Sequence, residues 1–174
     1  VLGVCTVVLA SSIWINPVAK GVPEITKSET MQQIRDLVKE DPKAIWLVVD
    51  MAYPATNIPA MAGADCLNTT QTYPQKTRWE MLDQEGEYED IYNRYCHIRA
   101  SLGSKTMLEL VSTDYVEVTL SPEELKKLNI RYIVSTNDFD EKIAAGITNI
   151  FTDSGIEFQK YYEGAQLSIF RCVY

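Results

Sequence analysis

The chain has 174 residues, of which 46% are hydrophobic and 23% are charged, and this composition is typical of one globular domain. Sixteen basic and 24 acidic residues give a net charge of −8 at pH 7. The basic residues are also scattered along the sequence, whereas a surface that follows phosphates needs clustered positive charge. Nucleic acid is therefore excluded as an expected partner.

The first 19 residues contain no charged side chain. We interpret residues 1–15 either as the end of a transmembrane helix or as a buried first strand, from Thr6 to Ile15, because both accept an uncharged apolar run. A spanning helix needs about 20 apolar residues, and Asn16-Pro17 ends the run short of that length. Residues 16–174 are then expected to form a single domain.

In the first half of this domain, one helix and one buried strand are predicted by clear patterns. Apolar residues at helical spacing predict a helix from its N-cap Ser28 to Lys39. The unbroken apolar run Ala44–Val49 predicts a strand that is covered on both faces. The other segments are predicted, in chain order, as a loop (Lys20–Lys27), a loop or short helix (Met51–Met61), two short helices (Thr77–Leu82 and Glu87–Asn93) and a strand (Tyr95–Leu102).

The last third of the chain has more regular patterns. Alternation predicts a strand over Tyr115–Leu120, with Val116, Val118 and Leu120 on its buried face. Ser121 as N-cap, Pro122 at the first helical position and Glu124 in a capping box predict a helix that ends near Leu128. The remaining segments are predicted as a buried strand (Ile130–Ser135), a helix (Asp140–Phe151) and the two strands of a hairpin (Glu157–Tyr162 and Leu167–Val173).

The predicted fold class is α/β, a single domain with a mixed sheet flanked by helices and with a C-terminal β-hairpin. Two units consist of a helix followed by an apolar run. Because crossover connections are right-handed and place their helices against the sheet, Ala44–Val49 and Ile130–Val134 should be interior strands of one sheet. The helices Ser28–Lys39 and Pro122–Leu128 should pack on that sheet.

The segment Asp65–Leu102 contains the only histidine, four tyrosines and one tryptophan among amides and charged side chains. Aromatic faces beside amides and guanidinium groups suit a polar, hydroxyl-rich partner such as a glycan. The candidate glycan-binding residues are Asn68, Tyr73, Trp79, Asp83, Tyr92, Asn93, Arg94, Tyr95 and His97. An internal scaffold is the alternative, because buried tyrosine hydroxyls and Arg94 can also hold the loop from Asn68 to Asp83.

Catalytic motifs are not evident, so no catalytic residue and no cofactor is predicted. The chain has no G-x-S-x-G, no Gly-rich phosphate loop and no H-E-x-x-H, and its single histidine excludes multi-histidine metal sites. A stand-alone hydrolase or transferase that uses His97 with Asp83 or Asp65 remains an alternative. The run of acidic residues from Asp83 to Asp90 is typical of a solvated helix face.

Four cysteines have no C-x-x-C spacing, so a structural zinc site is not expected. Cys66 and Cys96 stand at either end of the aromatic segment and are interpreted as either bridged or free and buried.

Several motifs together resemble a known family. They are N-P-V-x-x-G (Asn16–Gly21), D-P-x-x-x-W (Asp41–Trp46), G-A-x-x-L-N (Gly63–Asn68), Tyr73-Pro74, W-x-x-L-D (Trp79–Asp83), Y-N-R-Y-x-H-I (Tyr92–Ile98) and K-L-N-I-R-Y-I-V-S (Lys127–Ser135). The chain from Asn16 onward resembles the C-terminal extracytoplasmic domain of large multi-pass bacterial membrane proteins of the GT-C glycosyltransferase type, close to YfhO-like members.

The resemblance implies a cell-membrane protein whose membrane part carries any transfer from a polyprenyl-phosphate sugar. It implies that this domain lies on the extracytoplasmic side, next to its own transmembrane domain, and is not an enzyme by itself. Its expected role is to recognise an envelope glycan, a polymer acceptor or a polyprenyl-linked saccharide. A purely structural interaction module is a further alternative.

Overall fold

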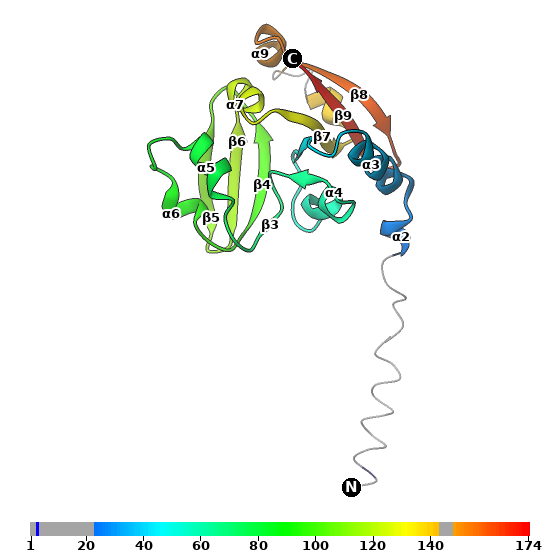
Figure 1. Ribbon diagram of the computed structural model, residues 1–174, viewed down its shortest axis with the longest axis horizontal. Coiled ribbons are helices and arrows are strands. Elements are labelled where there is room, and N and C mark those ends of the chain that lie inside the picture. The colour runs from blue at the N-terminus through cyan, green and yellow to red at the C-terminus, as the bar shows by residue number, and fades with distance from the viewer. Residues whose placement is uncertain (1–2, 4–22, 143–147) are drawn as a thin grey trace.

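The structure is a computed structural model that describes residue 3, residues 23–142 and residues 148–174 (Figure 1). The prediction for residues 1–15, a transmembrane end or a first strand, lies outside the described residues apart from Gly3. The predicted loop Lys20–Lys27 is described from Pro23 onward, where a single helical turn, α2 (Pro23–Thr26), forms part of it.

Sheet I has five strands, and both predicted interior strands belong to it. Its order is β2 (Asp65–Cys66), β1 (Ile45–Val48), β7 (Ile130–Thr136), β9 (Leu167–Val173) and β8 (Glu157–Glu163). The strand β1 is parallel to β2 and β7, whereas β9 is antiparallel to β7 and β8. The predictions of two interior strands in one sheet and of a C-terminal hairpin are thus confirmed.

Sheet II has four strands in the order β3 (Thr70–Gln71), β4 (Cys96–Leu102), β6 (Tyr115–Leu120) and β5 (Met107–Ser112). Its central pair, β4 and β6, is parallel, and the two outer strands are antiparallel to them. A β-bridge between Val49 and Ala100 joins the two sheets, and the amide of Asp50 donates to the Ala100 carbonyl at 2.8 Å. The fold is α/β as predicted, with two mixed sheets instead of one.

The helices that follow α2 are α3 (Glu29–Glu40), the 3₁₀ turn η1 (Ala55–Asn57), α4 (Ile58–Met61), α5 (Lys76–Leu82), α6 (Glu89–Tyr92), α7 (Pro122–Lys127), α8 (Phe139–Lys142) and α9 (Thr148–Asp153). The helices α3, α5 and α7 begin within one residue of their predicted starts, and α6 begins two residues later than predicted. Of the predicted helix Asp140–Phe151, the structure describes α8 and α9, and residues 143–147 lie outside the described residues. The hydroxyl of Ser28 accepts from the amide of Met31 at 3.2 Å and caps α3. The hydroxyl of Ser121, in contrast, donates to the carboxylate of Glu124 and makes no cap bond to α7, so the predicted capping box does not form.

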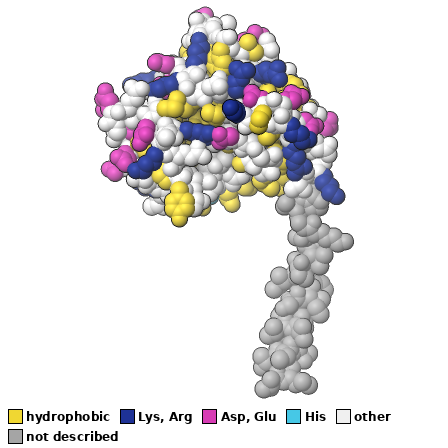
Figure 2. Space-filling model, in the orientation of Figure 1, with side chains coloured by type: hydrophobic (Ala, Val, Ile, Leu, Met, Phe, Trp, Pro, Cys, Tyr) yellow, Lys and Arg dark blue, Asp and Glu magenta, His cyan; other side chains and the backbone are white. Residues whose placement is uncertain are grey.

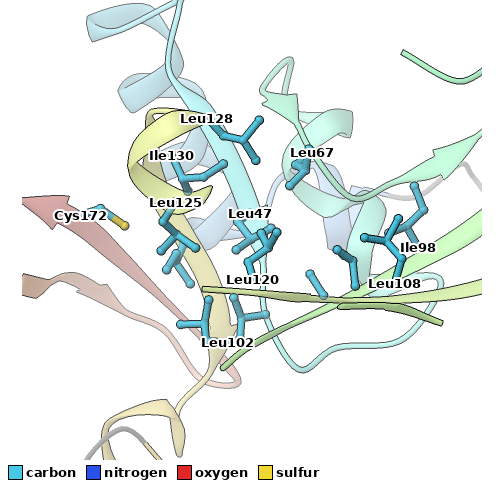
Figure 3. Close-up of a cluster of buried hydrophobic side chains, with 14 of the residues drawn as sticks. Leu47, Leu67, Ile98, Leu102, Leu108, Leu120, Leu125, Leu128, Ile130 and Cys172 are labelled. Carbon is cyan, nitrogen blue, oxygen red and sulfur yellow. The ribbon is translucent and has the colours of Figure 1, made fainter. Parts of the chain in front are cut away.

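The core has two parts because β1 is buried on both faces. On one face Trp46 and Val48 pack under α3, whose Ile34 and Leu37 are fully buried. On the other face Leu47 points into the space between the two sheets (Figure 3). The larger cluster there includes Leu67, Ile98, Leu102, Leu108, Leu120, Leu125, Leu128, Ile130 and Cys172. The prediction that α3 and α7 pack on the sheet is therefore confirmed.

Trp46→Ala tests this arrangement, because the indole is fully buried and its ring centroid lies 4.5 Å from that of Tyr132. We expect the free energy of unfolding to fall by about 3–5 kcal/mol, the usual cost of such a cavity. Denaturant unfolding measures this change, and Tyr73→Ala, at a ring that is 84% exposed, is the control with almost no effect. A loss below about 1 kcal/mol for Trp46→Ala would show that β1 is not central.

Candidate functional site

The segment Asp65–Leu102, here called the aromatic segment, crosses from one sheet to the other. Its first strand, β2, is the edge strand of sheet I, and its second, β3, is the edge strand of sheet II. The helices α5 and α6 then lie beside sheet II before the chain enters β4 (Figure 1). The segment therefore occupies the margin where the two sheet edges meet.

A buried amide organises this segment from inside. The Oε1 of Gln71 accepts from the indole N–H of Trp79 at 2.7 Å, and its Nε2 donates to the carbonyls of Tyr92 at 2.7 Å and Arg94 at 3.0 Å. The rings of Trp79 and Tyr92 are stacked, with centroids 5.2 Å apart and planes 6° from parallel. Both rings are almost fully buried, so they stabilise the domain and do not form an outer surface.

Two further candidate residues also face inward. The side chain of Asn68 is fully buried and pairs with both backbone groups of Val48, accepting from its N–H at 2.8 Å and donating to its carbonyl at 2.7 Å. The buried carboxylate of Asp83 accepts from the amides of Glu87 at 2.9 Å and Tyr88 at 2.8 Å. The predicted single surface of nine residues is thus corrected, because Asn68, Trp79, Asp83 and Tyr92 belong to the internal scaffold.

The buried phenol of Tyr92 is kept in its neutral form. Burial is the main cause that raises its pKa, and the neighbouring carboxylates of Asp83 and Glu89 raise it further.

The other candidates remain at the surface, but they do not form one group. Tyr73 is 84% exposed, Tyr95 is 51% exposed, and Asn93 is exposed at the C-terminus of α6. Arg94 is half-buried and donates through Nη2 to the carbonyl of Asp90. Within the described residues its Nε is buried without a hydrogen-bond partner. The contact with Asp90 is local, because this residue lies four positions earlier, on α6.

His97 is held by uncharged neighbours. Its Nδ1 lies 3.0 Å from the hydroxyl of Thr70, and its Nε2 lies 3.5 Å from the hydroxyl of Tyr95. The carboxylate of Asp83 binds backbone amides, and that of Asp65 is paired with Arg78. These contacts do not support a hydrolase or transferase that uses His97 with either carboxylate.

A pocket of about 240 Å³ opens at the junction of the sheet edges. Its lining is rich in hydroxyl and amide groups and includes one guanidinium. The lining residues are Cys66, Leu67, Thr69, Thr70, Gln71, Thr72, Tyr73, Gln75, Arg78, Trp79 and Ile98. Of the nine predicted residues, the structure places two, Tyr73 and Trp79, at this pocket.

Arg78 is fixed at one side of the pocket. Its side chain is 17% exposed, its Nη2 donates to the carboxylate of Asp65, and its Nη1 donates to the carbonyl of Cys66 at 3.4 Å. Because the positive charge is already balanced by Asp65, the pocket favours a neutral polar ligand over an anion. The sequence feature that marks this site is the polar run Thr69–Thr72 followed by Arg78, which is not part of the aromatic pattern.

The thiols of Cys66, Cys96 and Cys172 are free and buried, so the bridged interpretation of Cys66 and Cys96 is wrong. Burial raises the pKa of Cys66 to about 12 and that of Cys96 to about 11. Thiols with such values are protonated at neutral pH and are poor nucleophiles.

Electrostatic features do not point to another class of ligand. On the face shown in Figure 2, acidic and basic side chains are interspersed over the surface. Within the described residues, no group of His, Cys, Asp and Glu side chains is suited to hold a metal ion. A search of the same residues for a helix that is long and apolar enough to cross a membrane found none.

Asn68→Ala tests the internal role of this side chain. The substitution leaves the buried N–H and carbonyl of Val48 unpaired, and each unpaired group costs about 1–3 kcal/mol. We expect the free energy of unfolding to fall by at least about 2 kcal/mol, as measured by denaturant unfolding. Asn93→Ala, at an exposed asparagine, is the matched control with a change within about 0.5 kcal/mol. Equal stability of the two variants would contradict the scaffold assignment.

Comparison with known proteins places the chain in a family. No curated protein and no solved structure matches the sequence. A family model matches residues 24–174, which is most of the chain and includes both sheets and the pocket. The chain therefore belongs to the family described as Domain of unknown function (DUF7654).

Proposed function

We propose that this chain is a non-catalytic, glycan-recognising domain on the extracytoplasmic side of a membrane-anchored, glycosyltransferase-like protein of the cell envelope. The observation that carries the glycan part is the pocket, in which hydroxyl and amide groups surround a fixed guanidinium beside the exposed ring of Tyr73. The membrane-anchored context rests on the motif resemblance described above.

The lining of the pocket matches the chemistry of a neutral sugar. A sugar ring presents several hydroxyls that both donate and accept, and threonine hydroxyls and glutamine amides offer the same two functions. The N–H groups of Arg78 are directional donors held in place by Asp65. The ring of Tyr73 offers a flat face for the C–H surface of a sugar. Because Arg78 is already paired with a carboxylate, neutral saccharides are favoured over acidic ones.

The lining also supports the non-catalytic part of the proposal. Among the described residues, those that line the pocket include neither a carboxylate nor a histidine that could serve as a general acid or base. The thiol of Cys66 is protonated because burial raises its pKa to about 12. In the proposed protein, transfer from a polyprenyl-linked saccharide takes place in the transmembrane domain, and this domain holds or presents a glycan.

Modest affinity is expected from a pocket of this size. A millimolar dissociation constant corresponds to about 4 kcal/mol. One stacked ring and a few hydrogen bonds can supply that amount after the cost of association.

The test is an NMR titration of the isotope-labelled chain with glucose, mannose, galactose and N-acetylglucosamine. We expect at least one of these sugars to bind in the millimolar range and to shift the signals of Tyr73 and of the Arg78 side chain. Tyr73→Ala and Arg78→Gln should each weaken binding roughly tenfold, which corresponds to about 1.4 kcal/mol. Thermal unfolding checks that the variants remain folded.

Matched controls remove a tyrosine and an arginine elsewhere on the molecule. Tyr161→Ala removes a tyrosine that is 44% exposed on β8, and Arg131→Gln removes an arginine whose Nε lies 4.0 Å from the carboxylate of Asp41. Both controls should bind as the parent does. If sugars shift none of the pocket residues, or if the controls and the pocket variants behave alike, the proposed function is wrong.

A further inference from the structure

A second group of aromatic side chains lies beside the pocket and has no part in the core. The rings of Tyr53 and His97 are 4.2 Å apart between centroids and tilted by 33°, and the ring of Tyr95 meets His97 edge-on at 5.6 Å. Tyr53 is 52% exposed and Tyr95 is 51% exposed. Half of each tyrosine is therefore open to solvent while its position is fixed by the histidine between them. We call these three residues the aromatic platform.

The histidine of the platform is positioned by two polar side chains. The Oδ1 of Asn57 accepts from the backbone N–H of Thr70 at 2.9 Å, which fixes the orientation of the amide. Its Nδ2 therefore donates to the hydroxyl of Thr70, 3.1 Å away. The hydroxyl can then donate to the Nδ1 of His97 at 3.0 Å. In this arrangement the neutral imidazole carries its proton on Nε2, next to the exposed hydroxyl of Tyr95.

One residue, Thr70, connects the platform to the pocket. Thr70 lines the pocket, contacts His97 through its side chain, and is paired with His97 in the register of β3 and β4. Thr70 lies on β3, the edge strand of sheet II, so the pocket and the platform meet at this strand. A ligand that is longer than one sugar unit and crosses this strand reaches both.

We propose that the aromatic platform is a second sugar-binding subsite, so that the ligand of this domain is a chain of at least two sugar units. This inference rests on the proposed function and extends it from a single sugar to an oligosaccharide. Two half-exposed tyrosine rings provide faces for the C–H surface of a second sugar. The Nε2 proton of His97 and the hydroxyl of Tyr95 provide hydrogen bonds to its hydroxyl groups. Asn57 and Thr70 act as positioning residues that keep the imidazole and its tautomer in place.

His97 is a specific reporter because it is the only histidine in the sequence. In untagged, uniformly labelled protein, long-range ¹H–¹⁵N spectra contain one imidazole. The probes are mono-, di- and trisaccharides of the β-1,4-glucose, α-1,4-glucose and β-1,4-N-acetylglucosamine series. We expect the trisaccharide of the preferred series to bind at least about fivefold more tightly than its monosaccharide, because the second contact becomes intramolecular. The imidazole signals should shift with the longer sugars only.

The double variant Tyr53→Ala/Tyr95→Ala should reduce trisaccharide affinity to that of the monosaccharide and leave monosaccharide binding unchanged. Tyr161→Ala, which removes an exposed tyrosine on sheet I, is the control and should retain the dependence on chain length. Should the double variant fail to fold, Tyr53→Leu is used in its place, since it retains apolar packing against His97 and removes the hydroxyl-bearing ring.

The possible outcomes separate this inference from the function on which it rests. If monosaccharides shift Tyr73 and Arg78 but chain length changes neither the affinity nor the His97 signals, the second subsite is wrong and the pocket stands. If monosaccharides and oligosaccharides shift none of these residues, both proposals are wrong. If the platform variants weaken monosaccharide binding as strongly as Arg78→Gln does, the platform is part of the first site and not a second one.

Discussion

The buried amide of Asn68 makes the hydrogen bonds on which the junction of the two sheet edges depends. The chain leaves sheet I after the two-residue strand β2, too early for the backbone to pair with the end of β1. The side chain of Asn68 takes over, because it offers Val48 one donor and one acceptor at 2.7 and 2.8 Å. The backbone of β1 remains paired, and the chain is released toward sheet II. The pocket forms where this release occurs.

A second amide, that of Gln71, fixes the other side of the same crossing. It joins Trp79 on α5 to the carbonyls of Tyr92 and Arg94, so one side chain connects β3, α5 and the turn into β4. Buried polar groups of this kind are costly when unpaired and strongly orienting when they are all paired. The consequence is that Thr70, which lies next to Gln71 on β3 and points to the other face of the strand, also has a fixed position.

The sequence predicted the parts of the fold that have strong local patterns. Ala44–Val49 is a continuous apolar run and Ile130–Ser135 is largely apolar, because both faces of β1 and β7 are covered. In contrast, β5 (Met107–Ser112) was not predicted, because five of its six residues are exposed and the strand has no alternation that a sequence could reveal. The strands β2 and β3 have two residues each, so only their long-range pairing defines them.

The candidate site was harder to predict than the fold, for a physical reason. Trp79 and Tyr92 have polar tips, and a polar tip suits a binding surface as well as a buried hydrogen bond. Whether this segment forms an internal scaffold or a binding surface depends on the hydrogen bonds of Gln71 and Asp83. Their partners are distant along the sequence or belong to the backbone, so the sequence does not reveal them. Tyr53 was likewise not predicted, because it lies in a turn 44 positions before His97, and long-range contacts such as the Val49–Ala100 bridge bring the two regions together. Tyr73 differs from Trp79 and Tyr92 because its ring is 84% exposed.

In the proposed function, a weak pocket beside the aromatic platform suits a domain that is attached to a membrane. Two contacts of modest strength, joined by one ligand, act together because the second forms at a high effective concentration. Each contact alone can still release quickly, since affinity differences between related ligands appear mainly in the dissociation rate. The proposed presentation of a glycan to another site would need this combination of retention and release. The paired guanidinium of Arg78 fits the same requirement, because an unpaired charge in the pocket would hold anionic groups in place of neutral sugars.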